Sequence, residues 1–137
     1  MDMTLAGITA LIVLALVVLG AGAVKRKPKD LKGAYFQAKW QELQAFCKDK
    51  ATWPLAVINA DKLLDEALKK RRFKGKTMGE RMVAAQRELT DNDGVWYAHK
   101  LRNRLVHEAD VNLKEADVKK ALIGIRQALK DLGATVK

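Results

Sequence analysis

The segment AHKLRNRLVHE, residues 98–108, decides the fold class and contains both histidines of the chain. It has no glycine or proline, and Leu101 and Leu105 are four residues apart, which predicts one apolar face of a helix. At about 100° per residue, four polar side chains fall on other positions, spread over roughly 140°. They are His99, Arg102, Asn103 and His107. This helix is therefore expected to pack through its leucines and to present an Arg, an Asn and two His elsewhere.

Four more segments place apolar residues at helical spacing. They are residues 34–48, a helix that starts at 52–54 and runs into the basic residues 69–76, residues 77–89, and a last helix between Asn112 and Gly133. The expected core stripes are Phe36, Trp40, Leu43 and Cys47; Val57, Ala60, Leu64, Ala67 and Leu68; Met82, Ala85 and Leu89; and Val118, Leu122, Ile125, Leu129 and Leu132. No segment reads as a strand. We expect an all-α, up-and-down bundle of four or five helices over residues 34–137.

Capping residues set the expected helix ends. The predicted N-caps are Thr52, Thr77 with Glu80, Asp93, and Asn112 with Glu115. Pro54 is expected in the first turn of its helix. Gly75 and Gly133 are predicted to end the second and last helices, and Gly124 to allow a close helix contact.

The first 24 residues differ from the rest. Residues 3–24 carry no charge and, at about 1.5 Å per residue, are long enough to span a hydrocarbon core of roughly 30 Å. A cleaved signal peptide is the competing interpretation, because residues 21–23 resemble a cleavage site. The acidic Asp2 before the segment and the basic residues 25–27 after it favour an anchor with the N-terminus outside and the C-terminal domain in the cytoplasm. The expected organisation is an anchor (1–24), a basic linker (25–33) and a helical domain (34–137).

Charge and cysteine content restrict the partners and the compartment. The net charge is +10, and residues 1–24 contribute only Asp2, so the remainder carries 26 − 15 = +11. This excess favours a polyanionic partner, either nucleic acid or anionic lipid, although part of it is accounted for by membrane topology. The single Cys47 excludes an intramolecular disulfide, and it is most simply a small buried residue.

The six residues from Arg102 to His107 resemble the R-x4-6-H motif of the HEPN superfamily (higher eukaryotes and prokaryotes nucleotide-binding domains). Such domains are helical bundles, and many are metal-independent ribonucleases. The resemblance covers roughly residues 33–133 and includes the polar loop and last amphipathic helix after the motif. It implies that Arg102 and His107 carry catalysis and that two protomers combine their motifs in one cleft, giving a homodimer through the motif-bearing helix. Many nuclease members have a Tyr two residues after the His, where this chain has Ala109.

The residue types fit this chemistry. Metal-independent RNA cleavage needs a proton-transfer group with a pKa near neutrality, which histidine supplies, and a fixed cation for the phosphate, which arginine supplies. Asn103 is one turn before His107, where it could orient the His or the scissile phosphate. In the alternative interpretation, Arg102 pairs with Asp61 or Glu66 of a neighbouring helix and His107 only caps its own helix.

A basic cluster is a candidate RNA-binding surface: Lys69, Lys70, Arg71, Arg72, Lys74 and Lys76. Such clusters are also common as solvated faces and helix ends. His99 is either a second proton-transfer or phosphate-binding group or a satisfied, partly buried residue, and Trp96 either stacks on a base or packs in the core. Residues 90–94 lack the spacing of a calcium loop, so no metal site and no cofactor is expected.

The expected function is therefore that of a membrane-anchored, HEPN-like, metal-independent endoribonuclease or RNA-binding protein at the cytoplasmic membrane face. The alternative is a non-catalytic HEPN-like interaction or dimerisation module at the membrane. A third possibility is a basic protein that binds anionic lipid through residues 25–29 or 69–76. The sequence names neither the RNA nor a partner or antitoxin.

Overall fold

The described residues form helices joined by loops, and none of them forms a strand. The computed structural model describes residues 31–134 and 136–137, and its α-helices are α2 (Gly33–Ala45), α3 (Trp53–Lys70), α4 (Met78–Ala85), α5 (Asn92–His107) and α6 (Glu115–Asp131). Two 3-10 turns, η1 (Phe46–Lys48) and η2 (Lys50–Thr52), connect α2 to α3. The predicted all-α bundle is confirmed for this part of the chain.

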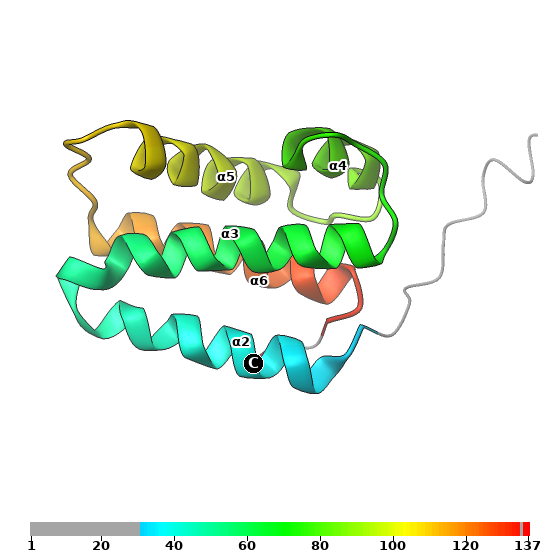
Figure 1. Ribbon diagram of the computed structural model, residues 1–137, viewed down its shortest axis with the longest axis horizontal. Helices are drawn as coiled ribbons and strands as arrows, with labels where there is room; N and C mark the ends of the chain where they lie inside the picture. Colours follow the sequence, from blue (N-terminus) through cyan, green and yellow to red (C-terminus); the bar gives the residue numbers. More distant parts are fainter. Residues whose placement is uncertain (1–30, 135) are drawn as a thin grey trace, which may run out of the picture.

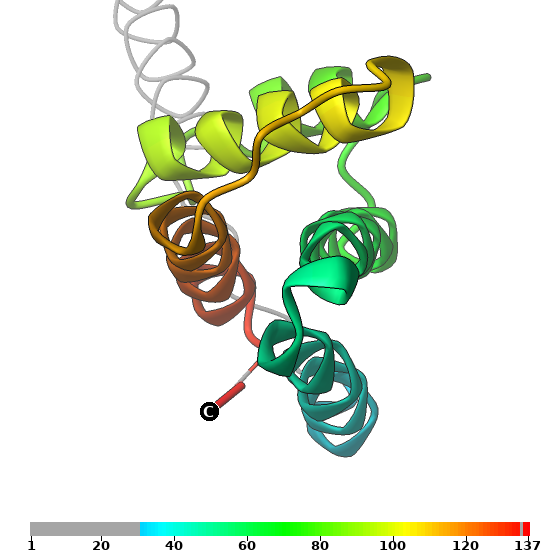
Figure 2. The same cartoon turned by 90° about the vertical axis from the view of Figure 1, so that its left-hand side faces the viewer.

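Helix α3 is the centre of the bundle. Helices α2, α3, α5 and α6 run in alternating directions along the long axis, and the short α4 lies at one end (Figure 1). Seen from the end of the bundle, α5 crosses over both α3 and α6 (Figure 2). Helix α3 contacts each of the other four α-helices. A polar side chain on α3 can therefore meet the motif-bearing α5 in the interior.

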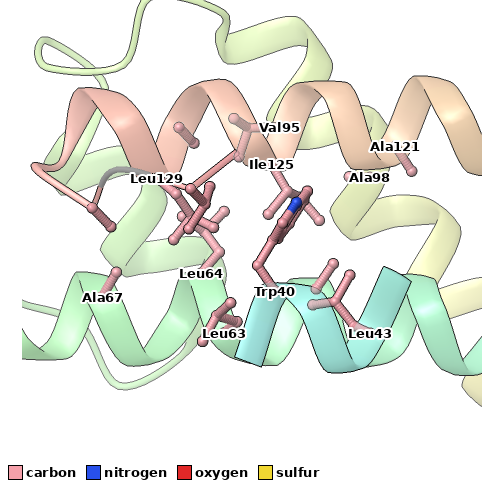
Figure 3. Packing of buried hydrophobic residues seen from close by; sticks show 14 of the residues in the cluster. Trp40, Leu43, Leu63, Leu64, Ala67, Val95, Ala98, Ala121, Ile125 and Leu129 are labelled. Carbon is pink, nitrogen blue, oxygen red and sulfur yellow. The ribbon is translucent and has the colours of Figure 1, made fainter. Parts of the chain in front are cut away.

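The predicted apolar stripes form one core. Each stripe residue named from the sequence is buried except Cys47 and Leu122, which are partly buried against the same core. Trp40 of α2 reaches between α3 and α6 toward Ile125 (Figure 3). Burial of one such large side chain contributes about 1.5–3 kcal/mol, so this core supplies the main stabilisation of the bundle.

Several predicted N-caps are wrong in whole or in part. Thr52 occupies the N-cap position of α3 as predicted, but its side chain accepts no capping hydrogen bond, and its hydroxyl donates to the carbonyls of Phe46 and Asp49. Asp91, not Asp93, caps α5 by accepting a hydrogen bond from the Gly94 N–H at 3.0 Å. Prolines and acids close to a helix start suggest its location, but the exact cap depends on which side chain reaches an unpaired N–H.

The last helix also starts later than predicted. Asn112 is exposed in the preceding loop, and Lys114 occupies the N-cap position. The Asp117 carboxylate accepts from the Lys114 N–H at 3.0 Å, which satisfies one donor at the helix start. At the other end, Gly133 adopts a φ of 98° and ends α6 as predicted.

Helix α3 ends before Gly75. Arg72 adopts the left-handed conformation with a φ of 60°. The Arg72 N–H donates to the Lys69 carbonyl at 2.9 Å, and the Phe73 N–H donates to the Leu68 carbonyl at 3.1 Å. This is the hydrogen-bond pattern of a Schellman end, with an arginine where glycine is usual. The predicted glycine stop at Gly75 is therefore wrong.

Helix α4 is shorter than predicted, ending at Ala85 rather than Leu89. Thr77 caps its start as predicted, accepting from the Glu80 N–H at 3.2 Å. After Ala85 the chain turns, and the Asn92 side-chain amide donates to the carbonyls of Gln86 and Leu89, each at 3.0 Å. This side chain provides the hydrogen bonds that a longer helix would have supplied.

The C-terminal tail packs back on the bundle. Ala134 and Val136 are fully buried, and the Lys137 N–H donates to the Gln37 side chain of α2 at 2.9 Å. The Arg126 Nε of α6 donates to the Val136 carbonyl at 3.3 Å. The tail thus connects α2 with α6. Helical periodicity does not predict this packing, because the tail is not part of a helix.

The predicted anchor, residues 3–24, and most of the predicted basic linker lie outside the described residues. Within residues 31–134 and 136–137, no helix combines the length and the apolar character needed to cross a membrane.

Candidate functional site

Local sequence fixes the position of α5. Asp91 caps its start, and Val95, Ala98 and Leu101 bury its apolar face. The Asp91 cap requires glycine at position 94, because a Cβ at Gly94 would collide with the Asp91 carboxylate. The motif side chains then follow on a helix whose rotation is set by its buried face.

Asp61 of α3 joins two of the candidate site residues. Its carboxylate is almost fully buried, with only 4% of the residue exposed. His99 Nδ1 lies 3.0 Å from Oδ1, and Arg102 Nε lies 3.7 Å from Oδ2. The alternative pairing of Arg102 with Asp61 is thereby confirmed, whereas Glu66 accepts from the Tyr35 hydroxyl instead. One buried carboxylate therefore faces two potentially cationic groups of α5.

Asn103 holds the other side of Arg102. The Arg102 Nη1 donates to the Asn103 Oδ1 at 3.0 Å. The Arg102 side chain keeps 35% of its surface exposed. A guanidinium has five N–H groups, and these two contacts involve only Nε and Nη1. Arg102 is thus fixed in direction while remaining accessible to an anion.

His99 is oriented through one ring nitrogen, and its side chain is 12% exposed. Its Nδ1 faces Asp61, while its Nε2 makes no hydrogen bond to any residue that the structure describes. The Trp96 ring approaches it edge-on, with 6.0 Å between the ring centroids. Trp96 is itself half-buried and packs near Gly79 of α4. The expectation that His99 is partly buried and satisfied is confirmed at Nδ1 only.

His107 stands apart from this group. It is the last residue of α5 and is exposed, and among the described residues its side chain makes no hydrogen bond or ion pair. It lies five positions after Arg102, which corresponds to about 7.5 Å along the helix axis and 140° around it. One chain therefore brings Arg102, Asn103 and His99 together but does not direct His107 to the same point.

The basic cluster divides into structural and exposed members. Arg71 is buried, with Nη2 at 2.6 Å from Glu88 and Nη1 donating to the Leu132 carbonyl at 2.9 Å. Lys69 is 3.4 Å from Asp65, and the Lys70 ammonium lies 4.6 Å from the Tyr35 ring centroid. The side chains of Arg72, Lys74 and Lys76 are exposed, and they make no such contact with the residues that the structure describes. This segment is at the end of the bundle opposite to the end of α5 (Figure 1).

Two surface cavities lie beside the site rather than on it. One is between α2 and α3, and is lined by Tyr35, Lys39, Asn59 and Lys62 among others. The other is between α5, its following loop and α6, with Tyr97, Lys100 and Arg104 in its wall. Neither is lined by Arg102, Asn103 or His107.

The Cys47 thiol has its pKa raised by burial, which does not favour a nucleophilic role.

No cluster of metal-binding side chains is found in the described part of the chain, where three or more His, Cys, Asp or Glu residues never come close enough to hold an ion.

The sequence-based interpretation did not recognise Asp61 as the residue that joins His99 to Arg102. A signal was present, because Asp61 follows Ala60 and precedes Leu64 within an otherwise apolar stripe. A charged residue in a core stripe is rarely buried without partners.

Comparisons with protein-family models, curated proteins and solved structures gave no match to this chain. The resemblance to HEPN domains therefore rests on the sequence motif, and the site has to be judged from its own geometry.

Proposed function

We propose that this protein is a HEPN-like, metal-independent endoribonuclease that acts at the cytoplasmic face of a membrane. The observation that carries the proposal is the fixed position of Arg102 between Asp61 and Asn103, with part of its guanidinium exposed. A guanidinium held in this way can bind a phosphate without losing side-chain freedom during the reaction. The uncharged segment 3–24 and the basic residues after it support the proposed membrane location.

The proposed roles follow from residue chemistry. Arg102 holds the scissile phosphate as negative charge accumulates, and Asn103 keeps the guanidinium in place. His107 transfers a proton. Because His107 and Arg102 of one helix point about 140° apart, His107 would come from a second copy packed against α5. An anchor in the same membrane would favour this pairing by raising the local concentration of protomers.

A non-catalytic dimerisation module remains the second candidate, and a different observation favours it. Leu55 and Val106 are large apolar residues with 43% and 48% of their surface exposed. Helix α3 begins and α5 ends at the same end of the bundle, so both residues belong to that end (Figure 1). If association is the whole function, Leu55→Ser and Val106→Ser abolish it, while Arg102→Gln leaves it intact.

The deciding experiment incubates the full chain, purified in mild detergent, with labelled single-stranded RNA in the presence of EDTA. We expect cleavage by the native protein and a loss of about 100-fold or more in Arg102→Gln. His107→Asn should lose cleavage as well. Arg104→Gln is the matched control, because Arg104 lies on the same helix and makes only an exposed pair with Glu108 at 3.6 Å. Intact RNA with the folded native protein would contradict the proposal and favour the dimerisation module.

A further inference from the structure

The Asp61 carboxylate is a hydrogen-bond partner that can orient the His99 ring for proton transfer. In hydrolytic sites, an acceptor on one ring nitrogen fixes the tautomer and direction of the imidazole, and the other nitrogen exchanges the proton. Here Asp61 Oδ1 lies 3.0 Å from Nδ1, and Asp61 is buried enough to exclude competing water. With the proton on Nδ1, Nε2 carries a lone pair and has no hydrogen-bond partner among the described residues.

The same carboxylate places this nitrogen beside the proposed phosphate-binding group. Arg102 Nε is 3.7 Å from Asp61 Oδ2, so His99 and Arg102 approach opposite oxygens of one side chain. They are three residues apart on α5, which puts them on adjacent turns of one face. An anion bound by the exposed part of Arg102 would therefore lie within reach of the imidazole.

His107 lacks this support. It is exposed at the helix end, and no described residue fixes either of its ring nitrogens. Without an orienting partner, a histidine ring can take several orientations, so it is less well placed to act as a general base. It can still donate a proton to a leaving group. His99 thus has a carboxylate that orients one of its ring nitrogens, whereas His107 has no such partner among the described residues.

We propose that His99, oriented by Asp61, is the general base of this site; the inference rests on the ribonuclease function proposed above. The Nε2 of His99 takes the proton of the ribose 2′-hydroxyl as the 2′-oxygen forms a bond to phosphorus. The bond from phosphorus to the 5′-oxygen breaks, and that oxygen receives a proton from His107 of a second copy. The products are a 2′,3′-cyclic phosphate and a 5′-hydroxyl, and no other reactant is needed. Asp61 is a positioning residue.

The test compares two substitutions at His99 in the full chain. In His99→Asn the side-chain amide can occupy the place of Nδ1 and donate to Asp61, but the nitrogen at Nε2 is absent. We expect this variant to keep the native thermal unfolding temperature and dimerisation, and to lose RNA cleavage by about 100-fold or more. In His99→Ala, added imidazole should restore part of the activity, which a purely structural role would not allow.

The outcomes separate the two proposals. Cleavage by native protein together with undiminished cleavage by His99→Asn would overturn the role of His99 and leave the ribonuclease proposal standing. Loss of cleavage in His99→Ala without any rescue by imidazole, in a variant with a lowered unfolding temperature, would assign His99 to structure instead. No cleavage by the native protein would remove both proposals.

Discussion

Gly124 of α6 lies directly against the backbone of Gly94 in α5. A Cβ at Gly124 would be 2.6 Å from both the carbonyl carbon and the carbonyl oxygen of Gly94. Two glycines facing each other let α5 and α6 approach more closely than side chains would permit. Because α5 carries Arg102 and His99, this contact also fixes how far the site residues stand from the rest of the bundle.

Gly124→Ala should therefore destabilise the protein despite the better helix propensity of alanine. The gain in propensity is at most about 1 kcal/mol, and forcing a backbone contact apart costs typically 1–3 kcal/mol, so the clash decides the sign. Denaturant unfolding measures the difference. Gly33→Ala is the control, since a Cβ at Gly33 meets nothing within 4 Å and should be neutral or stabilising. Equal stability of the two variants would contradict the close contact.

Arg72→Gly should stabilise the end of α3. An L residue in the left-handed conformation costs roughly 1–2 kcal/mol, and glycine avoids that cost. Arg72→Ala provides the comparison, because it removes the same charge but keeps the strained φ of 60°. The expected order of unfolding temperatures is glycine above alanine. The reverse order would contradict a strain cost at this φ, since neither variant carries the arginine side chain.

Acid should weaken the connection between α3 and α4. Arg81 Nε and Nη2 donate to the two Asp65 oxygens at 2.7 and 2.9 Å. Burial by itself would raise the pKa of Asp65, but the hydrogen bonds and charge of Arg81, with Lys69, outweigh it and lower the pKa from 3.8. A carboxyl whose pKa is lower in the folded state stabilises the protein above its unfolded pKa, and this contribution is lost as pH falls through the folded value.

The matched variant is Asp65→Asn. At neutral pH it should be less stable than the native protein by about 1.5–3 kcal/mol, the range for hydrogen bonds to a charged group. As the pH falls below 3.8, the difference in unfolding free energy should shrink toward zero. Urea unfolding of the native protein and of Asp65→Asn, from neutral pH to below pH 3.8, measures this difference. A difference that does not change with pH would show that shape, and not charge, accounts for the effect.

The sequence predicted the core stripes, but the ends of the helices only in part, as at Thr77 and Gly133. Phe36, Trp40 and Leu43 recur on one face, and burial of that face follows from the pattern alone. The start of α5 did not follow, because Asp91 and Asp93 are both good caps and the choice depends on which carboxylate reaches the Gly94 N–H. Cap choice is a matter of local geometry that spacing does not contain.

The candidate site was predictable in its residue types and not in its grouping. Arg102, Asn103 and His107 stand out in the sequence because they share a segment, residues 98–108, without glycine or proline. The link from His99 to Arg102 passes through Asp61, about 40 residues earlier, and exists only because α5 crosses over α3 (Figure 2). Contacts between helices depend on their crossing geometry, which the period of one helix does not specify.

Arg71 and its basic neighbours should respond differently to removal of charge. Arg71 is buried against Glu88 and the Leu132 carbonyl, so Arg71→Met leaves a partly buried carboxylate and a carbonyl without their donor. Breaking such a pair from one side costs about 3–5 kcal/mol. Lys74→Gln and Lys76→Gln affect exposed side chains and should leave the unfolding free energy unchanged.

RNA binding gives the complementary measurement for the same variants. If the exposed lysines contact phosphates, Lys74→Gln with Lys76→Gln weakens binding and reduces the slope of log affinity against log salt by nearly one for each lost contact. Gel-shift titrations of full-length protein at several salt concentrations provide that slope. An unchanged slope in the lysine variant would exclude this surface from the RNA interface, and would leave Arg102 as the cation to test for phosphate binding.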